Sequence, residues 1–149
     1  MLIGIPALLG PEFLAILRAM GHGDEIAIVD GNYPAEEHAR RLVRADGHGL
    51  IEVLDAVLTV LPVDDFVPEA LFRSSVKGDP AEKLDPVHDE IIATCKRHAP
   101  KTAVIAMAGG NFYDRVKAAY AVVATGEPQL YANVIIRKGV IYPKAEQQS

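Results

Sequence analysis

The stretch GHGDEIAIVD, residues 21–30, carries the clearest strand signal in the sequence. Its second half is rich in Ile and Val, so we predict a short buried strand over Glu25–Asp30. Before it, Pro11 suits the first turn of a helix that Gly21 brings to an end. The stretch therefore joins a helix to a strand, and the fold depends on whether this alternation continues.

The alternation continues along the chain. Further helices are predicted at Ala35–Arg44, Leu50–Leu61, Asp85–His98 and Asn111–Ala118. Further strands are predicted at Ala70–Val76, Thr102–Met107, Tyr120–Thr125 and Asn133–Arg137. This order favours a layered α/β fold with a largely parallel central sheet flanked by helices on both faces. The last two strands follow each other closely, so the sheet is expected to be partly mixed.

Length and composition are those of one globular domain. The chain has 149 residues, and 15 Lys and Arg against 20 Asp and Glu give 15 − 20, a net charge of −5. One domain takes roughly 100–200 residues, and the 50% of hydrophobic residues exclude wholesale disorder. We predict a single α/β domain over residues 1–143 and a polar carboxy-terminal tail over residues 144–149.

Composition also argues against several classes of protein. The sequence pI of about 5.5 and the lack of a clustered basic face disfavour nucleic acid as a partner. No apolar run approaches the ~18 residues that cross a membrane, and no Lys or Arg precedes the apolar amino terminus as in a signal peptide. The single cysteine, Cys95, excludes an intramolecular disulfide and is expected to be a small buried hydrophobe. A reducing compartment fits, so we expect a cytoplasmic protein.

His22 lies between two glycines, on backbone that can adopt unusual φ and ψ angles. Its imidazole can give or take a proton near neutral pH. Asp30 follows the strand, where ligands gather in α/β sheets, and it can accept hydrogen bonds from a hydroxylated ligand. The alternative is structural: Gly23 caps the helix, His22 is a solvated corner and Asp30 caps a turn. A metal site built from His22, Asp24 and Asp30 has no two-histidine helical spacing to support it, so no metal is predicted.

Two later stretches carry polar groups with two interpretations each. Residues 108–111, AGGN, lie between a strand and a helix, where backbone N–H groups can hold an anion, or where the chain simply makes a tight turn. Tyr131 and Asn133 project from the same side of an extended chain, which suits a polyol; the alternative is a half-buried tyrosine and a turn-ending asparagine. Tyr113, at the head of its helix, allows the same two interpretations. The other histidines are expected on polar or solvent-facing surfaces: His38, His48, His88 and His98.

Six stretches together point to one family. They are MGHGDEI at 20–26 with the following Asp30, RADG at 44–47, FYDR at 112–115, AVVATGE at 121–127, YAN at 131–133 and KGV at 138–140. Each is weak alone, but they extend over nearly the whole chain. The sequence resembles the L-fucose mutarotase / D-ribose pyranase family, and the fucose mutarotase branch more closely.

The resemblance implies an α/β fold and an isomerase that interconverts monosaccharide anomers or ring forms, a reaction that needs no cofactor. It also implies homo-oligomeric rings, often decamers of two pentameric rings, with sites at subunit boundaries. By motif, His22 matches the proton donor and Asp30 a sugar-binding aspartate. Residues 131–133 match a Tyr-Gly-Asn sugar-binding segment, with Ala132 in place of glycine.

One position departs from the family pattern. In the fucose branch a sugar-contacting arginine precedes the aromatic run before Tyr113, and Gly109 stands at the matching position here. Without the rigid guanidinium and its five hydrogen-bond donors, we expect an open space here and a change in which sugar hydroxyls the protein recognises. The reaction class therefore carries over better than the identity of the sugar.

We therefore predict a monosaccharide mutarotase for fucose or a related sugar, with His22 as the catalytic acid. The residues expected around the substrate are Asp30, Gly109, Tyr113, Tyr131 and Asn133. One alternative is a non-catalytic monosaccharide-binding or transport-accessory protein, which needs no ionisable group at position 22. Another is a phosphosugar enzyme that uses the glycines at 109 and 110 to bind an anion.

Overall fold

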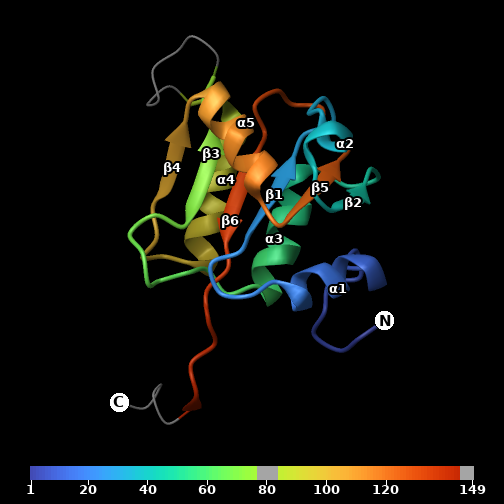
Figure 1. Ribbon diagram of the computed structural model, residues 1–149, viewed down its shortest axis with the longest axis vertical. Helices are drawn as coiled ribbons and strands as arrows, with labels where there is room; N and C mark the ends of the chain where they lie inside the picture. Colours follow the sequence, from blue (N-terminus) through green and yellow to red (C-terminus); the bar gives the residue numbers. More distant parts are fainter. Residues whose placement is uncertain (77–83, 145–149) are drawn as a thin grey trace.

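Within residues 1–76 and 84–144, which the computed structural model describes, six strands form one mixed sheet (Figure 1). In the order of their pairing, the strands are β2 (Leu42–Ala45), β5 (Ala121–Thr125), β1 (Glu25–Val29), β6 (Val134–Arg137), β3 (Leu71–Ser74) and β4 (Val104–Met107). β6 runs antiparallel to its neighbours β1 and β3, and the other pairings are parallel. The prediction of a largely parallel, partly mixed sheet is confirmed.

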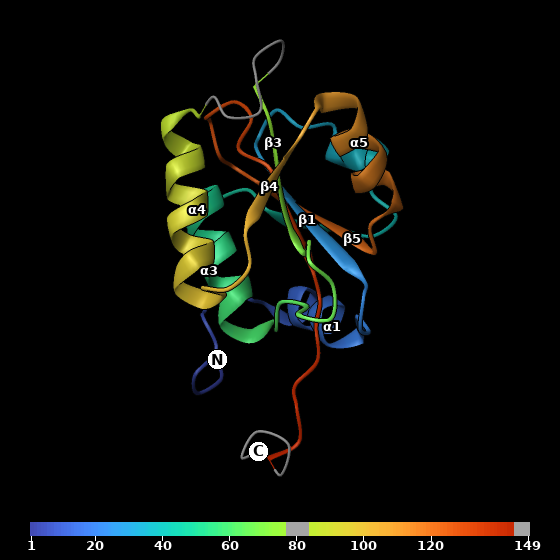
Figure 2. The same cartoon turned by 90° about the vertical axis from the view of Figure 1, so that its left-hand side faces the viewer.

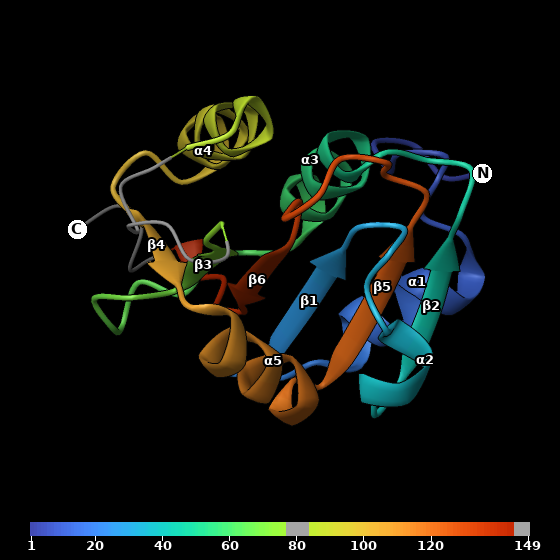
Figure 3. The ribbon, with the colours of Figure 1, turned by 90° about the horizontal axis from the view of Figure 1, so that it is seen from above.

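Helices cover both faces of this sheet, as predicted (Figure 2). On one face, α1 (Pro11–Ala19), α3 (Leu50–Val60) and α4 (Pro86–His98) share the larger apolar core, which also holds the buried Cys95. On the other face, α2 (Ala35–His38) and α5 (Gly109–Ala118) enclose a smaller core around Phe112. Figure 3 shows α3 and α4 on one side of the strands and α2 and α5 on the other.

β1 is a nearly continuous apolar run because both of its faces are buried. Ile26 and Ile28 point into the larger core, whereas Ala27 and Val29 point into the smaller one. This is the alternation that a strand between two helical layers requires. Glu25 opens the strand and Asp30 follows it, so each end of β1 carries a carboxylate.

The predicted helix over Ala35–Arg44 is wrong. Only Ala35–His38 is helical, and Leu42–Ala45 forms the edge strand β2, which pairs in parallel with β5. The segment is rich in charged residues and helix formers, and this composition favours a helix. The pairing with β5 makes this segment a strand instead. Val43 and Ala45 are buried and Arg44 between them is exposed, and this alternation with a period of two is typical of a strand.

Three smaller differences concern helix positions and the tail. α5 begins at Gly109, two residues before the predicted start. His88 was expected on a solvent-facing side of its helix, but its side chain is fully buried. The predicted tail over 144–149 lies, from residue 145 onwards, outside the described residues. Among the described helices, none has the length and apolar character needed to cross a membrane.

Candidate functional site

One cavity of about 860 Å³ is lined by five of the six candidate residues: Asp30, Gly109, Tyr113, Tyr131 and Asn133. It lies at the edge of the sheet where parallel strands end, because Asp30 follows β1 and Ser74 ends β3. Asn133 reaches the same edge because the antiparallel β6 begins there. Ligands of α/β sheets gather beyond the carboxyl ends of the strands, and this cavity has that position.

Asp30 and Asn133 hold each other in place in the cavity wall. The Oδ1 atom of Asn133 accepts the backbone N–H of Asp30 at 2.9 Å, and its Nδ2 donates to Ser74 at 3.2 Å. The Asp30 carboxylate accepts the N–H of Asn32 at 2.9 Å, which also closes the turn that the structural alternative predicted. Burial raises the pKa of Asp30, although hydrogen bonds from Asn32 and Asn133 act against the rise. The remaining lone pairs of the carboxylate suit sugar hydroxyls.

The glycine corner of the cavity is open. A Cβ added at Gly109 or Gly110 would meet no atom of the described residues within 4 Å. This is the open space that the sequence predicts at Gly109.

Tyr131 has a strained backbone at the cavity. Its φ of 58° is the one positive value of a non-glycine residue among the described residues. Its carbonyl accepts hydrogen bonds from Nε2 of His88 at 2.9 Å and from the hydroxyl of Ser74 at 3.0 Å. Nδ1 of His88 accepts the backbone N–H of Asp85 at 3.1 Å, which places the ring proton on Nε2. Buried His88 thus holds the Tyr131 segment as a neutral imidazole.

We expect acid to weaken this support. Burial lowers the pKa of His88, and its hydrogen bond to the Tyr131 carbonyl acts against this shift. The positive charge of Arg73 lowers the pKa further, whereas the carboxylates of Asp85 and Asp89 raise it. Below the ordinary pKa of about 6.5 the unfolded chain then binds a proton that the folded chain does not. Stability is therefore fully present above that pH and falls as the pH drops towards the folded-state value.

Urea unfolding between pH 5 and 7 measures the loss as a fall in the free energy of unfolding. A tenfold difference in proton affinity between the folded and unfolded chains corresponds to about 1.4 kcal/mol. His88→Gln, which keeps a donor near the Nε2 position, is expected to flatten the slope. The raised pKa of Asp30 acts in the opposite direction, so Asp30→Asn is the second control. An unchanged slope in His88→Gln contradicts the assignment.

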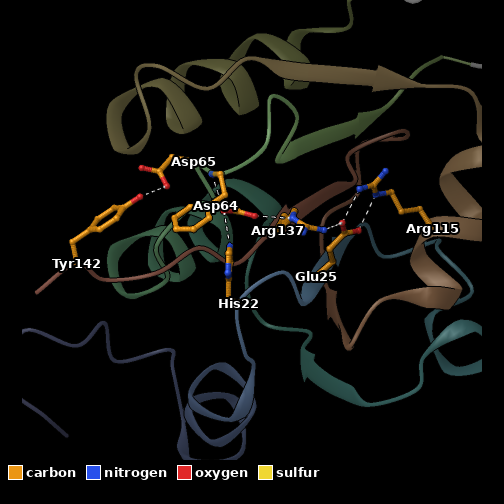
Figure 4. A network of polar contacts seen from close by, with 8 residues as sticks. His22, Glu25, Asp64, Asp65, Arg115, Arg137 and Tyr142 are labelled. Carbon is orange, nitrogen blue, oxygen red and sulfur yellow. Dashed lines mark hydrogen bonds and ion pairs between the residues drawn. The ribbon is translucent and has the colours of Figure 1, made fainter.

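His22 lies at the opposite edge of the sheet, in a network of charged groups (Figure 4). Its Nε2 is 2.9 Å from Oδ1 of Asp64, whose other oxygen accepts Nε–H of Arg137 at 2.8 Å. Nη1 of Arg137 also lies 3.9 Å from Oε2 of Glu25, an ion pair. Arg115 donates two hydrogen bonds of 2.7 and 2.8 Å to the same carboxylate. His22 is therefore a paired group rather than a free solvated corner.

Asp64 determines which nitrogen of the His22 imidazole is available to a ligand. Burial raises the pKa of the Asp64 carboxyl, but hydrogen bonds from Arg137, the Phe66 backbone and His22 outweigh it, and the pKa is lowered. An ionised Asp64 accepts Nε2–H of His22, so the outer nitrogen, Nδ1, is the one that can exchange a proton with a ligand. The Phe66 ring meets the imidazole edge to face at 4.6 Å and is itself 61% exposed.

The structure does not bring His22 and Asp30 together within one chain. They lie before and after β1, and its five residues alone span about 16 Å. The cavity is therefore lined by Asp30 and Asn133 but not by the His22 of the same chain.

Sequence reasoning missed the partners of the candidate residues. Asp64 and Arg137 hold His22, His88 holds Tyr131, and His38 bonds the hydroxyl of the cavity residue Tyr33 at 2.8 Å. Each partner lies at least five positions from the group it contacts, on another element or in a loop. No local pattern marks such residues, although a histidine or aspartate inside an apolar segment is a weak signal.

Comparisons with known proteins agree with the fold and the motifs. The family model described as "RbsD / FucU transport protein family" matches residues 3–141. A fucose mutarotase of Homo sapiens is 43% identical over 143 residues, 93% of each chain. An L-fucose mutarotase of Actinobacillus pleuropneumoniae is 38% identical, over 94% of this chain and 97% of the relative. A crystal structure of the fucose mutarotase of Streptococcus pneumoniae in complex with L-fucose superposes with a TM-score of 0.87 at 37% identity, covering 95% of this chain and 100% of that one.

Proposed function

The chain belongs to the RbsD / FucU family, and on that premise we propose that it is a monosaccharide mutarotase, an isomerase that interconverts the anomers of fucose or a related sugar. The observation that carries the proposal is the cavity, which gathers Asp30, Tyr113, Tyr131 and Asn133 in a chain whose relatives are fucose mutarotases. Carboxylate, phenol and amide groups around one cavity suit the many hydroxyls of a monosaccharide.

The reaction consists of proton transfers and ring opening. The ring oxygen gains a proton, the anomeric hydroxyl loses one, and the ring closes again after the carbonyl has rotated. None of these steps changes the oxidation state of the sugar, so acid–base groups suffice. Such groups typically raise a reaction rate by about 10²–10⁴-fold. His22 supplies the acid: Asp64 accepts its Nε2–H, which leaves Nδ1–H to protonate the ring oxygen. Asp30 and Asn133 orient the sugar.

The separation of His22 from the cavity supports a site shared between subunits. We place the His22 of one subunit over the cavity of its neighbour, in a homo-oligomer built from pentameric rings or a decamer. The surface around His22 suits such a contact, because Phe66, whose ring meets the imidazole, is 61% exposed, and Tyr142, which stacks on Phe66, is 37% exposed. A heterologous contact of this kind closes into a ring when the rotation from one subunit to the next is a whole fraction of a turn.

The experiment that tests the function is anomer-exchange NMR with L-fucose, D-ribose, D-galactose and D-glucose. We expect saturation of one anomeric proton to transfer to the other anomer faster with the protein than without it, for at least one of these sugars. Size exclusion in the same buffer is expected to show a species several times larger than the 16.1 kDa chain. Sugar binding without faster exchange supports the non-catalytic alternative instead.

A further inference from the structure

An aromatic cluster forms one wall of the cavity. The rings of Tyr33, His38 and Tyr113 meet edge to face in all three pairs, with centroid distances of 5.2 to 5.3 Å. Tyr33 follows Asp30 in the turn after β1, His38 ends α2 and Tyr113 lies on α5. Tyr33 and Tyr113 line the cavity, and His38 is half-buried at the end of its helix. Three separate elements thus fix the orientation of the Tyr33 ring.

The hydroxyl of Tyr33 is bonded to an imidazole. Its oxygen lies 2.8 Å from Nδ1 of His38. When Nδ1 is unprotonated, the phenol O–H donates to it, and the phenol oxygen keeps lone pairs that can accept a hydrogen bond from a ligand. Burial raises the pKa of Tyr33, and nearby Tyr113 and Asp30 raise it further, so the phenol stays un-ionised near neutral pH. Such a phenol can accept one proton only while it releases another.

Ring opening needs an acceptor as well as a donor. The assignment of His22 provides the proton for the ring oxygen and leaves the proton of the anomeric hydroxyl without a destination. We propose that Tyr33 and His38 form a proton relay that accepts this proton, with Tyr33 as a further catalytic residue and His38 as its proton acceptor. The inference rests on the proposed mutarotase function and adds the second half of its acid–base chemistry.

The protons and electrons of the step balance. The anomeric O–H gives its proton to the Tyr33 oxygen, while the Tyr33 proton moves to Nδ1 of His38. The electron pair left on the anomeric oxygen forms the carbonyl, and the bond between the anomeric carbon and the ring oxygen breaks. Its electron pair stays on the ring oxygen, which takes a proton from a protonated His22. Ring closure on the other face of the carbonyl reverses each transfer and restores both histidines.

The test compares exchange rates and sugar affinities of variants in the whole protein. Tyr33→Phe keeps the ring contacts with His38 and Tyr113 and removes only the hydroxyl. We expect it to slow exchange at saturating sugar by about 10–100-fold with little change in KM. This factor lies at or below the lower end of the about 10²–10⁴-fold that is usual for acid–base groups. Tyr120→Phe is the matched control, because Tyr120 precedes β5 at the opposite edge of the sheet beneath Arg41.

A second variant separates proton transfer from packing. His38→Ala is expected to lose a similar factor, and added imidazole is expected to restore part of the rate. Imidazole should not help Tyr33→Phe, in which the intermediate carrier is missing. The double variant should be no slower than the slower single one, because both residues act as one unit.

The outcomes distinguish the relay from the function on which it rests. If the unaltered protein accelerates exchange of no sugar in the panel, the mutarotase proposal fails and the relay fails with it. If the unaltered protein is active and Tyr33→Phe exchanges as fast, the relay alone is overturned. A variant that only raises KM assigns Tyr33 to sugar binding and also overturns the relay.

Discussion

His22→Ala is expected to abolish anomer exchange, and mixing it with inactive Asp30→Asn is expected to restore about a quarter of the normal rate. Each variant alone loses one half of the shared site: the first lacks the acid, the second lacks the sugar-binding carboxylate. We expect His22→Ala to be slowed at least about 100-fold, as is usual when an acid–base group is removed, and Asp30→Asn to be slowed similarly because the sugar is no longer oriented. Neither change disturbs the core, since His22 is part-exposed and Asp30→Asn keeps the shape of the side chain.

The fraction restored follows from how the subunits mix. In an equimolar random mixture, half of the subunits carry an intact His22 and half carry an intact Asp30. A site that takes His22 from one subunit and its cavity from the next is then complete in half of a half of the interfaces. A site contained in one chain would gain nothing from mixing, since every chain in the mixture is defective.

The measurement is saturation-transfer NMR after the two variants have been unfolded together and refolded. The variants refolded separately and then combined without exchange serve as the control and should remain inactive. A second control, His22→Ala refolded with unaltered protein, should keep about half of the rate, because half of the sites receive the acid. Full recovery, or none, in the first mixture contradicts the shared site.

The fold follows largely from short-range patterns. Strands such as β1 and β5 are apolar, rich in Val or Ile and bounded by turn residues, and the helices between them have recognisable starts. β2 was not predicted, because an edge strand with one exposed face carries charges such as Arg44, which a helix also tolerates. What makes it a strand is its pairing with β5, in which Leu42 pairs with Val122, and no local pattern contains that information.

The site could be predicted only in part, and the reason is the same. Asp30 and Asn133 are recognisable because they stand at strand ends, where polar side chains in apolar surroundings are conspicuous. That they meet depends on the antiparallel course of β6, which the sequence does not specify. His22 stood out through its glycine neighbours, yet its distance from the cavity and its partner Asp64 depend on the whole fold. Interactions between distant segments are therefore what the sequence leaves open.

The AVVATGE stretch, residues 121–127, shows how one motif serves several contacts at once. Thr125 donates its hydroxyl to the carbonyl of Val29 at 2.7 Å, and Glu127 accepts the backbone N–H of Leu50, at the start of α3, at 3.1 Å. The carbonyl of Glu127 accepts the N–H of Gly31, directly after Asp30, at 2.8 Å. The motif thus ties the end of β5 to α3 and to the turn that follows Asp30.

Gly126 is the position in this motif that tolerates no side chain, and Gly126→Ala is expected to destabilise the protein by about 3 kcal/mol or more. A Cβ there would overlap the carbonyl oxygen of Asp46, in the turn after β2. The neighbouring atom belongs to the backbone rather than to a flexible side chain, and the N–H of Gly126 donates to the carbonyl of His48 at 2.9 Å. Neither the end of β5 nor the turn after β2 can therefore move apart without a large energetic cost. The strain should also loosen the attachment of the Gly31 turn and weaken sugar binding.

Gly47→Ala is the matched control for this change. Gly47 lies in the same turn as Asp46, its Cβ direction is open among the described residues, and its φ is not positive. Its substitution should therefore alter stability by no more than about 0.5 kcal/mol. Urea unfolding at one fixed protein concentration measures both variants, because assembly into an oligomer contributes to the apparent stability. Equal midpoints for the two variants would show that the turn after β2 can move away from β5, and the motif would then owe its glycine to something other than this close approach.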